Sequence, residues 1–235
     1  MTSTPANDPA PRGVFVVFEG GDGAGKSTQV ALLSQWLGER GVEHVLTREP
    51  GGTALGTRLR ELLLHVEDGG PVPRAEALLF AADRAQHAAT LVRPALAAGR
   101  WVVSDRYIDS SIAYQGGGRD LDTDEVARLS AWATDELVPD LTVLLDVPVA
   151  VGAQRRRSAA APEDRMESES VRFHEQVAQR FRQLAEAAPQ RYLVLDATAE
   201  PAALSAAVRD RIDALRGALP DGLPDGHTER SGVRP

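Results

Sequence analysis

The sequence has no cysteine, no long hydrophobic run and no excess of positive charge. Without cysteine the chain has no disulfide framework and no thiolate ligands for zinc, which is typical of a protein of the reducing cytoplasm. Its net charge of −8 argues against a general nucleic-acid binder or a membrane-surface protein, because both need excess basic residues. No apolar run approaches the ~20 residues of a membrane span. We therefore expect a cytoplasmic protein with no nucleic-acid or membrane partner.

Length and composition predict one α/β domain between two disordered tails. A chain of 235 residues holds one such domain with a full core, or at most two small ones. Residues 1–12 are polar and rich in proline, and residues 217–235 are rich in Pro, Gly and Asp, which is typical of disorder. The folded domain is therefore expected over residues 13–216.

Short apolar runs alternate with longer amphipathic stretches along this domain. The expected strands are Val14–Phe18, Val42–Thr47, Trp101–Ser104, Leu141–Leu145 and Tyr192–Leu195. The expected helices are Ser27–Arg40, Thr57–Val66, Arg74–Leu91, Asp109–Gln115, Asp122–Glu136, Pro148–Arg157, Ser168–Ala188 and Pro201–Leu215. Pro94 is expected to kink or restart the third helix, and Gly116-Gly117-Gly118 to end the fourth. The alternation predicts right-handed βαβ units and a three-layer α/β fold, with a five-stranded parallel sheet flanked by helices.

The most informative stretch is Gly20-Gly21-Asp22-Gly23-Ala24-Gly25-Lys26-Ser27, which follows an expected strand and opens an expected helix. This G-x-x-x-x-G-K-[ST] pattern in that context predicts a P-loop. Residues without a Cβ let backbone N–H groups approach phosphate oxygens, and the helix N-terminus adds partial positive charge. Lys26 can reach the β- and γ-phosphates of ATP, and the Ser27 hydroxyl suits Mg²⁺. Thr28 continues the expected ATP-binding segment.

The carboxyl ends of parallel strands share one rim of the sheet, where ligands bind. This places Glu19, Arg48, Asp105 and Asp146 on the same rim as the P-loop. Asp105 is a candidate to organise Mg²⁺ or to act as a base, and the adjacent Arg106 offers a fork for a second phosphate. A surface Asp–Arg pair is the weaker interpretation. Asp146 is the weaker carboxylate candidate, because an Asp before Val147-Pro148 can simply cap the next helix.

Two further patterns indicate an acceptor site and a lid. Phe80 and Arg84 lie at i and i+4 on one helix face, where a ring can stack on a nucleobase and a guanidinium can donate to a base carbonyl. Taken alone, a core Phe beside a surface Arg is the commoner case. The cluster Arg155-Arg156-Arg157 and the segment Asp164-Arg165-Met166-Glu167 flank an Ala-rich loop. A solvated charged face is the plain interpretation, and a lid over residues 155–167 that closes on ATP and excludes water is the sharper one.

The motifs together resemble the bacterial type of thymidylate kinase, a family of P-loop nucleoside-monophosphate kinases. The resemblance covers about Val14 to Arg216 and leaves out both tails. Its stretches are Phe18 through the P-loop to Ser27, Thr47-Arg48-Glu49-Pro50-Gly51-Gly52-Thr53, Asp105-Arg106-Tyr107 through Ala113-Tyr114-Gln115-Gly116-Gly117-Gly118-Arg119, and Asp164-Arg165-Met166-Glu167. The resemblance implies the reaction ATP + dTMP → ADP + dTDP with Mg²⁺, and it implies a homodimer.

The resemblance also implies roles for individual residues. It assigns the ATP phosphates to the P-loop amides and Lys26, with Asp22 near the sugar and the transfer site. The acceptor residues that it implies are Arg48 and Arg106 for the dTMP phosphate, Phe80 to stack on thymine, Arg84 for a base carbonyl, Ser111 and Gln115 for the base pocket, and Tyr114 under the sugar. Because Asp22-Gly23-Ala24 brings no basic residue into the P-loop, the catalytic arginine is expected from the lid. Arg157 and Arg165 are the candidates, and Arg156 is expected to stack on adenine.

Three alternatives stay open at this point. The nearest is another nucleoside-monophosphate or deoxynucleoside kinase on the same scaffold. A regulatory GTPase would need an Asn-Lys-x-Asp segment, and the single Asn of the chain is Asn7. A non-catalytic nucleotide-binding module is disfavoured by the intact set of Lys26, Asp105 and arginines.

Overall fold

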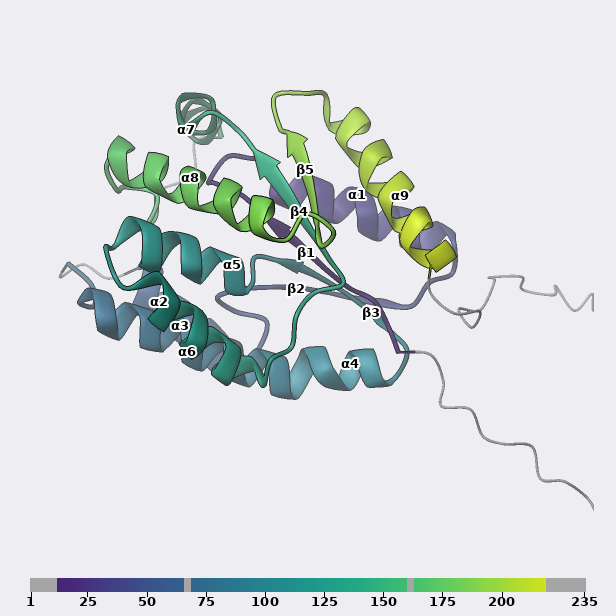
Figure 1. Cartoon of the computed structure of the whole chain (residues 1–235), viewed down its shortest axis with the longest axis horizontal. Helices are drawn as coiled ribbons and strands as arrows, with labels where there is room; N and C mark the ends of the chain where they lie inside the picture. The colour runs from purple at the N-terminus through teal and green to yellow at the C-terminus, as the bar shows by residue number, and fades with distance from the viewer. Residues whose placement is uncertain (1–11, 66–68, 160–162, 219–235) are drawn as a thin grey trace, which may run out of the picture.

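The computed structural model describes residues 12–65, 69–159 and 163–218, which form a parallel sheet between layers of helices (Figure 1). The strands are β1 (Phe15–Glu19), β2 (His44–Arg48), β3 (Trp101–Asp105), β4 (Leu141–Asp146) and β5 (Tyr192–Asp196). They lie in the order β2-β3-β1-β4-β5, and every neighbouring pair is parallel. The expected α/β fold with a five-stranded parallel sheet is confirmed.

Helices follow each strand, as the alternating pattern predicted. The α-helices are α1 (Lys26–Glu39), α2 (Ala54–Leu64), α3 (Pro73–His87), α4 (Arg93–Ala97), α5 (Ile108–Ser111), α6 (Thr123–Thr134), α7 (Val149–Ser158), α8 (Val171–Ala187) and α9 (Pro201–Ala218). Two π-helical segments, η1 (Ala88–Val92) and η2 (Ile112–Gly118), continue α3 and α5. The chain restarts an α-helix at Arg93-Pro94, as expected of a proline that has no N–H to donate.

The expected end of the fourth helix is wrong. Gly116, Gly117 and Gly118 lie within η2, which ends at Gly118 and not at Gln115. Their role is close packing, because a Cβ on Gly118 would lie 2.4 Å from the ring of Phe173 in α8. A run of glycines can allow a close approach as well as end a helix, and the sequence alone did not distinguish the two.

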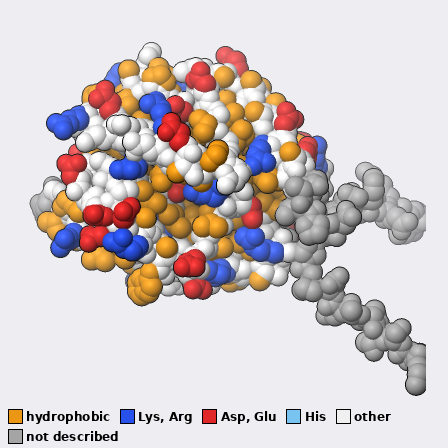
Figure 2. Space-filling model, in the orientation of Figure 1, with side chains coloured by type: hydrophobic (Ala, Val, Ile, Leu, Met, Phe, Trp, Pro, Cys, Tyr) orange, Lys and Arg blue, Asp and Glu red, His pale blue; other side chains and the backbone are white. Residues whose placement is uncertain are grey.

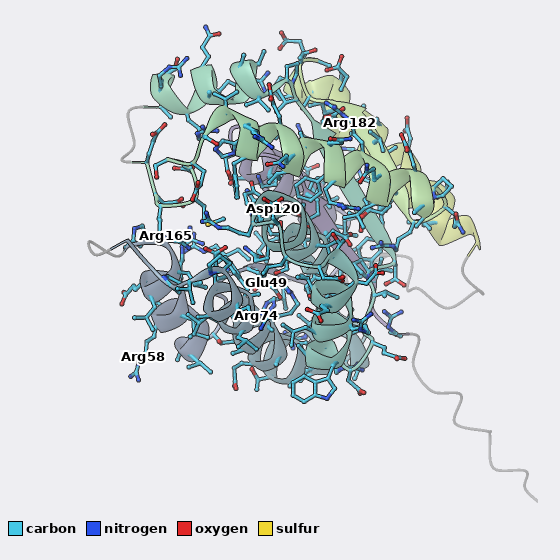
Figure 3. The ribbon with its side chains drawn as sticks, turned by 60° about the vertical axis from the view of Figure 1, so that its left-hand side comes forward. Glu49, Arg58, Arg74, Asp120, Arg165 and Arg182 are labelled. Carbon is cyan, nitrogen blue, oxygen red and sulfur yellow. The ribbon has the colours of Figure 1, made fainter. Side chains whose placement is uncertain are left out.

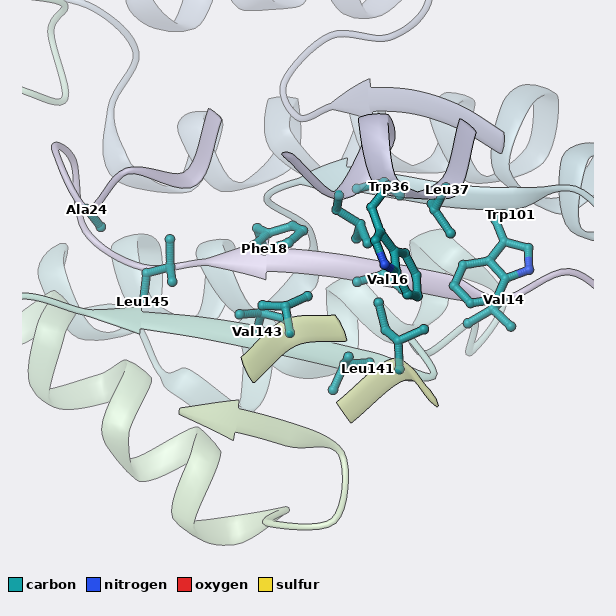
Figure 4. Packing of buried hydrophobic residues seen from close by; sticks show 14 of the residues in the cluster. Val14, Val16, Phe18, Ala24, Trp36, Leu37, Trp101, Leu141, Val143 and Leu145 are labelled. Carbon is teal, nitrogen blue, oxygen red and sulfur yellow. The ribbon is translucent and has the colours of Figure 1, made fainter. Parts of the chain in front are cut away.

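Alternation along the strands divides the core between the two faces of the sheet. Val16 and Phe18 of β1 face α1 and α9, where Trp36 completes a buried cluster (Figure 4). Val17, the residue between them, faces η1 and α4 on the other side. Because parallel sheets are covered on both faces, both sets are apolar. The P-loop leaves β1 at the carboxyl rim of this sheet, which is covered on both faces.

The surface carries charge of both signs. Acidic and basic side chains are interspersed over the face seen in Figure 2, with apolar side chains between them. Within the described ranges, no helix combines the length and the apolar character needed to span a bilayer. The expected tails lie outside the described residues, apart from Arg12 and the last turn of α9, which reaches Ala218.

Candidate active site

The P-loop connects β1 to α1 and lies against the start of α7. Gly20 has φ +138° and Gly23 has φ +79°, values that favour glycine. A Cβ on Gly20 would lie 2.4 Å from the carbonyl oxygen of Leu145, and one on Gly23 would lie 2.2 Å from that of Gly152. The glycines therefore allow both the turn and the close approach of the loop to its neighbours.

Lys26 folds back over this loop. Its Nζ donates to the carbonyl oxygens of Gly20 at 3.1 Å and Gly21 at 2.9 Å. Burial, with the neighbouring charge of Arg106, lowers the pKa of Lys26. No side chain caps the N-terminus of α1 at Gly25, so its backbone N–H groups are available to an anion. The loop, the lysine and the uncapped helix end thus lie together at the carboxyl rim of the sheet.

Ser27 and Asp105 bring two oxygen donors together beside the P-loop. Ser27 Oγ donates to Asp105 Oδ2 at 3.2 Å, across the gap between α1 and the end of β3. Asp105 Oδ1 is buried and accepts no hydrogen bond from the described residues. Mg²⁺ takes one or two protein oxygens and completes its shell with phosphate oxygens and water. The pair therefore fits Mg²⁺, although the described residues contain no cluster of three or more His, Cys, Asp or Glu for a metal.

Arg106 lies at the centre of the site, directly after β3. Its φ of 72° is uncommon for a residue with a side chain. Its guanidinium donates to the carbonyl oxygen of Gly20 at 3.1 Å, to the hydroxyl of Tyr114 at 3.1 Å and to the carboxylate of Asp22. Although burial raises the pKa of Asp22, Arg106 and Lys26 lower it to about 2. Asp22 is thus an anion that fixes Arg106, and Tyr114 donates to it at 2.8 Å.

Glu19, the last residue of β1, holds the segment that carries Arg106. It is fully buried and accepts from the backbone N–H of Tyr107 at 2.9 Å and from the hydroxyl of Ser110 at 2.6 Å. Burial raises the pKa of Glu19 to about 7, with a further contribution from Asp109. The sequence placed Glu19 on the active rim without a role. The structure gives it one, because it anchors the turn between β3 and α5.

One wall of the site rests on buried contacts to Glu49. Arg84 is 1% exposed, and its Nε donates to Glu49 Oε2 at 2.7 Å. Its Nη1 donates to the Ser111 hydroxyl at 3.1 Å. His87 contacts the other oxygen of Glu49 at 2.8 Å. Arg84 is therefore a buried, oriented donor and not the surface side chain of the commoner interpretation. Its partner Glu49 directly follows Arg48 in the sequence. This adjacency to a predicted site residue was the sequence signal that could have placed Glu49 at the site.

These elements enclose one cavity of about 480 Å³. Its walls include fifteen of the residues that the sequence predicted: Asp22, Gly23, Gly25, Lys26, Ser27, Thr28, Arg48, Phe80, Arg84, Asp105, Arg106, Ser111, Tyr114, Gln115 and Arg156. Five others do not line it: Gly20, Gly21, Ala24, Arg157 and Arg165. Other residues that line it had no individual role in the sequence analysis: Glu49, Pro50, Arg60, Leu64 and Ser110, with Arg155, Ala159, Asp164, Met166 and Glu167 of the expected lid. Arg60 and Leu64 lie on α2 outside every recognised motif, so no sequence signal identified them.

The arginines around the lid have different positions. Arg156 Nη1 donates to the carbonyl oxygen of Asp22 at 3.0 Å, beside the P-loop. Arg165, labelled in Figure 3, does not line the cavity: it pairs with Glu76 of α3 and donates to the carbonyl oxygen of Leu63 of α2 at 2.8 Å. Part of the expected lid, residues 160–162, lies outside the described residues.

Asp146 has neither of the roles that the sequence left open for it. The N-cap of α7 is Pro148, without a side-chain hydrogen bond, and Asp146 does not line the cavity. Its two carboxylate oxygens accept from Arg182 of α8 at 2.8 and 3.0 Å. The interpretation of Asp146 as a helix cap is wrong, because an ion pair to α8 occupies the carboxylate.

Comparison with known proteins gives one consistent result. The family model described as thymidylate kinase matches residues 18–208. Thymidylate kinase of Clavibacter michiganensis subsp. michiganensis is 55% identical over 203 residues, 86% of this chain and 96% of the relative. Thymidylate kinase of Cutibacterium acnes is 55% identical over 203 residues, with 86% and 98% covered. That of Desulfovibrio desulfuricans is 51% identical over 207 residues, with 86% and 95% covered. The chain belongs to the thymidylate kinase family.

Proposed function

We propose that the chain transfers the γ-phosphoryl group of ATP to dTMP and releases ADP and dTDP. The observation that carries this proposal is one cavity that joins five P-loop residues, Asp22, Gly23, Gly25, Lys26 and Ser27, to a second set of phosphate and base donors. A P-loop alone would support ATP binding. Here Arg106 lies between the P-loop and the base side, where it contacts both Gly20 and Tyr114. Two anions bound on either side of it would meet in line.

The donor half binds and orients the phosphates. The backbone amides of the P-loop and Lys26 hold the ATP phosphates, and Ser27 and Asp105 hold Mg²⁺. Bound Mg²⁺ offsets the charge of the phosphate oxygens. Because phosphoryl transfer needs no covalent enzyme intermediate, the protein contributes position and fixed positive charge.

The acceptor half holds dTMP by its phosphate and its base. Arg48 and Arg106 bind the 5′-phosphate, since a guanidinium fork matches phosphate geometry. Phe80 offers its ring to thymine, and Arg84 is held by Glu49 so that it can donate to a base carbonyl. Ser111 and Gln115 complete the base pocket, and Tyr114 lies under the sugar.

We assign the lid to residues 155–167. Its closure over ATP excludes water and brings an arginine to the transferring phosphoryl group. The ion pair between Arg165 and Glu76 favours a donor from the cluster 155–157 over Arg165. Arg156, which lines the cavity and donates to the carbonyl of Asp22, is suited to reach adenine. Arg157 does not line the cavity in this structure and would reach the phosphoryl group when the lid closes.

The proposed enzyme is a homodimer of the cytoplasm. Helices α2, α3 and α6 lie side by side (Figure 1). Each exposes a large apolar side chain, with Leu62 at 53%, Leu78 at 58% and Trp132 at 81% exposure. Exposed apolar side chains on adjacent helices favour a protein interface. The absence of cysteine supports a reducing compartment.

Product analysis tests this function. The purified chain is incubated with Mg·ATP and dTMP, and the nucleotides are separated by chromatography. We expect ADP and dTDP to form in equal amounts, and neither to form when Mg²⁺ is chelated. ADP formation without dTDP would identify an ATPase, and the proposal would then be wrong.

A further inference from the structure

Glu76 is a buried carboxylate that the proposed mechanism does not use. It lies in the first turn of α3 and is fully buried. Three side chains from two other parts of the chain donate to it: Gln115 of η2, Arg119, and Arg165 from the C-terminal part of the lid segment. A buried carboxylate is expensive unless it is paired and hydrogen-bonded. Arg119 and Arg165 supply the positive charge that offsets the buried carboxylate. The hydrogen bond from the neutral Gln115 amide is therefore not needed to offset that charge.

The contact with Gln115 determines which way its amide faces. Gln115 Nε2 donates to Glu76 Oε1 at 3.0 Å. A carboxylate only accepts hydrogen bonds, so the nitrogen of the amide must face Glu76 and the oxygen must face away. Gln115 lines the cavity, and no described residue donates to its Oε1. The oxygen is therefore left as an acceptor for a ligand in the cavity.

We infer that Glu76 is a positioning residue: it holds the Gln115 amide with its oxygen toward the acceptor base and so selects bases that carry an N–H at that position. This inference rests on the proposed function. Thymine presents an N3–H between two carbonyls, whereas cytosine presents an unprotonated N3. A fixed acceptor at Gln115 suits the first base and opposes the second.

The same carboxylate links the base pocket to the C-terminal part of the lid segment. Arg165 pairs with Glu76 and also donates to Leu63 of α2. Arg119 pairs with Glu76 and with Glu169, which precedes α8. These pairs immobilise the carboxylate from two directions. A rotation of the Glu76 side chain that would release Gln115 must therefore break both ion pairs.

The test is a change of base selectivity in Glu76→Gln, with Glu169→Gln as the matched control. Both variants remove a carboxylate that pairs with Arg119, but Glu169 does not contact Gln115. Once Glu76 is an amide, Gln115 can turn over and offer its nitrogen to the base. We expect the ratio of kcat/KM for dTMP to kcat/KM for dCMP to fall about tenfold or more in Glu76→Gln. The KM for ATP should stay unchanged, and Glu169→Gln should keep the wild-type ratio.

A double variant separates positioning from general loosening. If Glu76 acts through Gln115, then Glu76→Gln should change the ratio very little in a Gln115→Ala background. Equal effects in both backgrounds, or a wild-type ratio in Glu76→Gln, would overturn the inference. A wild-type ratio in Glu76→Gln would leave the proposed function intact, because the wild type would still phosphorylate dTMP. Failure of the wild type to phosphorylate dTMP would contradict the proposed function itself.

A measurement on the unaltered chain covers the case in which Glu76→Gln does not fold. The side-chain amide protons of Gln115 are assigned by NMR from their loss in Gln115→Ala. A hydrogen bond to a buried carboxylate should slow their exchange with water well below the rate of an exposed glutamine. Exchange at the rate of an exposed glutamine would overturn the inference.

Discussion

At the scale of the residue, the site is a set of charges that hold one another in place. Arg106 keeps an uncommon backbone conformation, with φ 72°, and its guanidinium is fixed by Asp22 and Tyr114. Such a conformation persists only where the surroundings determine it. Here Glu19 binds the backbone N–H of the next residue, Tyr107. The result is a guanidinium in a fixed position before any substrate arrives.

Replacement of Arg106 should separate the two substrates. In Arg106→Ala the acceptor phosphate loses its fork, while Lys26 and the P-loop amides remain. We expect dTMP turnover to fall by a factor on the order of 10³, with ATP affinity unchanged. Steady-state kinetics and calorimetric titration with ATP measure the two effects. Arg182→Ala, which removes a half-exposed arginine paired with Asp146, should behave as the wild type. Near-normal dTMP use by Arg106→Ala would contradict the phosphate role.

Glu19 should make the stability of the fold depend on pH. Its pKa is about 7 in the folded chain, against an ordinary 4.5, so the folded state binds more protons than the unfolded state between these values. The free energy of unfolding therefore falls as pH rises from about 4.5 to about 7, by up to about 3 kcal/mol, and the Glu19 contribution is constant above that range. In Glu19→Gln this contribution disappears. Urea denaturation at pH 5 and pH 7.5 measures it in both proteins, and an identical pH dependence would contradict the assignment.

How far the sequence predicts a residue's position depends on where its partners lie. Ser27, Asp105 and Arg106 follow from the P-loop motif and from the shared rim of a parallel sheet, and the structure brings them together. Arg165 also belongs to a recognisable motif, but its partner Glu76 lies 89 residues earlier in the chain. No local pattern indicated that ion pair, so the sequence could not direct Arg165 toward α3.

At the scale of the element, packing decides what a glycine means. The segment η2 carries Tyr114 and Gln115 into the cavity, and its glycines face neighbouring side chains. Phe173 of α8 occupies the space beside Gly118, in the same buried cluster as Tyr114. Hydrophobic periodicity predicted these helices but not the contact between Gly118 and Phe173, because that contact joins segments that are distant in the sequence.

A methyl group at Gly118 should destabilise the fold. The Cβ of Gly118→Ala would lie 2.4 Å from the ring of Phe173, which is 5% exposed. The ring must shift in a packed core, and we expect a loss of about 1–3 kcal/mol in the free energy of unfolding. Gly38→Ala is the control, because its Cβ meets nothing within 4 Å on helix α1; it should be neutral or stabilising by up to about 1 kcal/mol. Equal free energies of unfolding for Gly118→Ala and the wild type, measured by urea denaturation, would show that the Phe173 contact is unimportant.

At the scale of the whole molecule, the sheet order builds the site. β3 lies beside β1, so Asp105 reaches Ser27, and β4 on the other side of β1 places α7 against the P-loop. The sequence predicted parallel strands and right-handed crossovers, and therefore a common rim. It did not predict the order β2-β3-β1-β4-β5, since several orders satisfy the same alternation.

The proposed homodimer predicts a concentration-dependent mass. Analytical ultracentrifugation of the wild type should give twice the chain mass. Leu62→Glu, which places a charge on the exposed apolar face of α2, should shift the chain toward the monomer. Val194→Glu is the control, because Val194 is also half-exposed, at 50%, but lies on β5. A monomeric wild type would contradict the dimer, and an equal shift in both variants would place the interface elsewhere.

The central claim is that the acceptor site selects a thymine deoxynucleotide. Its most direct test is ADP release with Mg·ATP against dTMP, dUMP, dCMP, dGMP, dAMP and UMP, each supplied alone. We predict strong release with dTMP, weaker release with dUMP and negligible release with the other four, because we propose that Phe80, Arg84 and Tyr114 define the base and sugar positions. A preference for another monophosphate would contradict the claim and would leave only the P-loop half of the account in place.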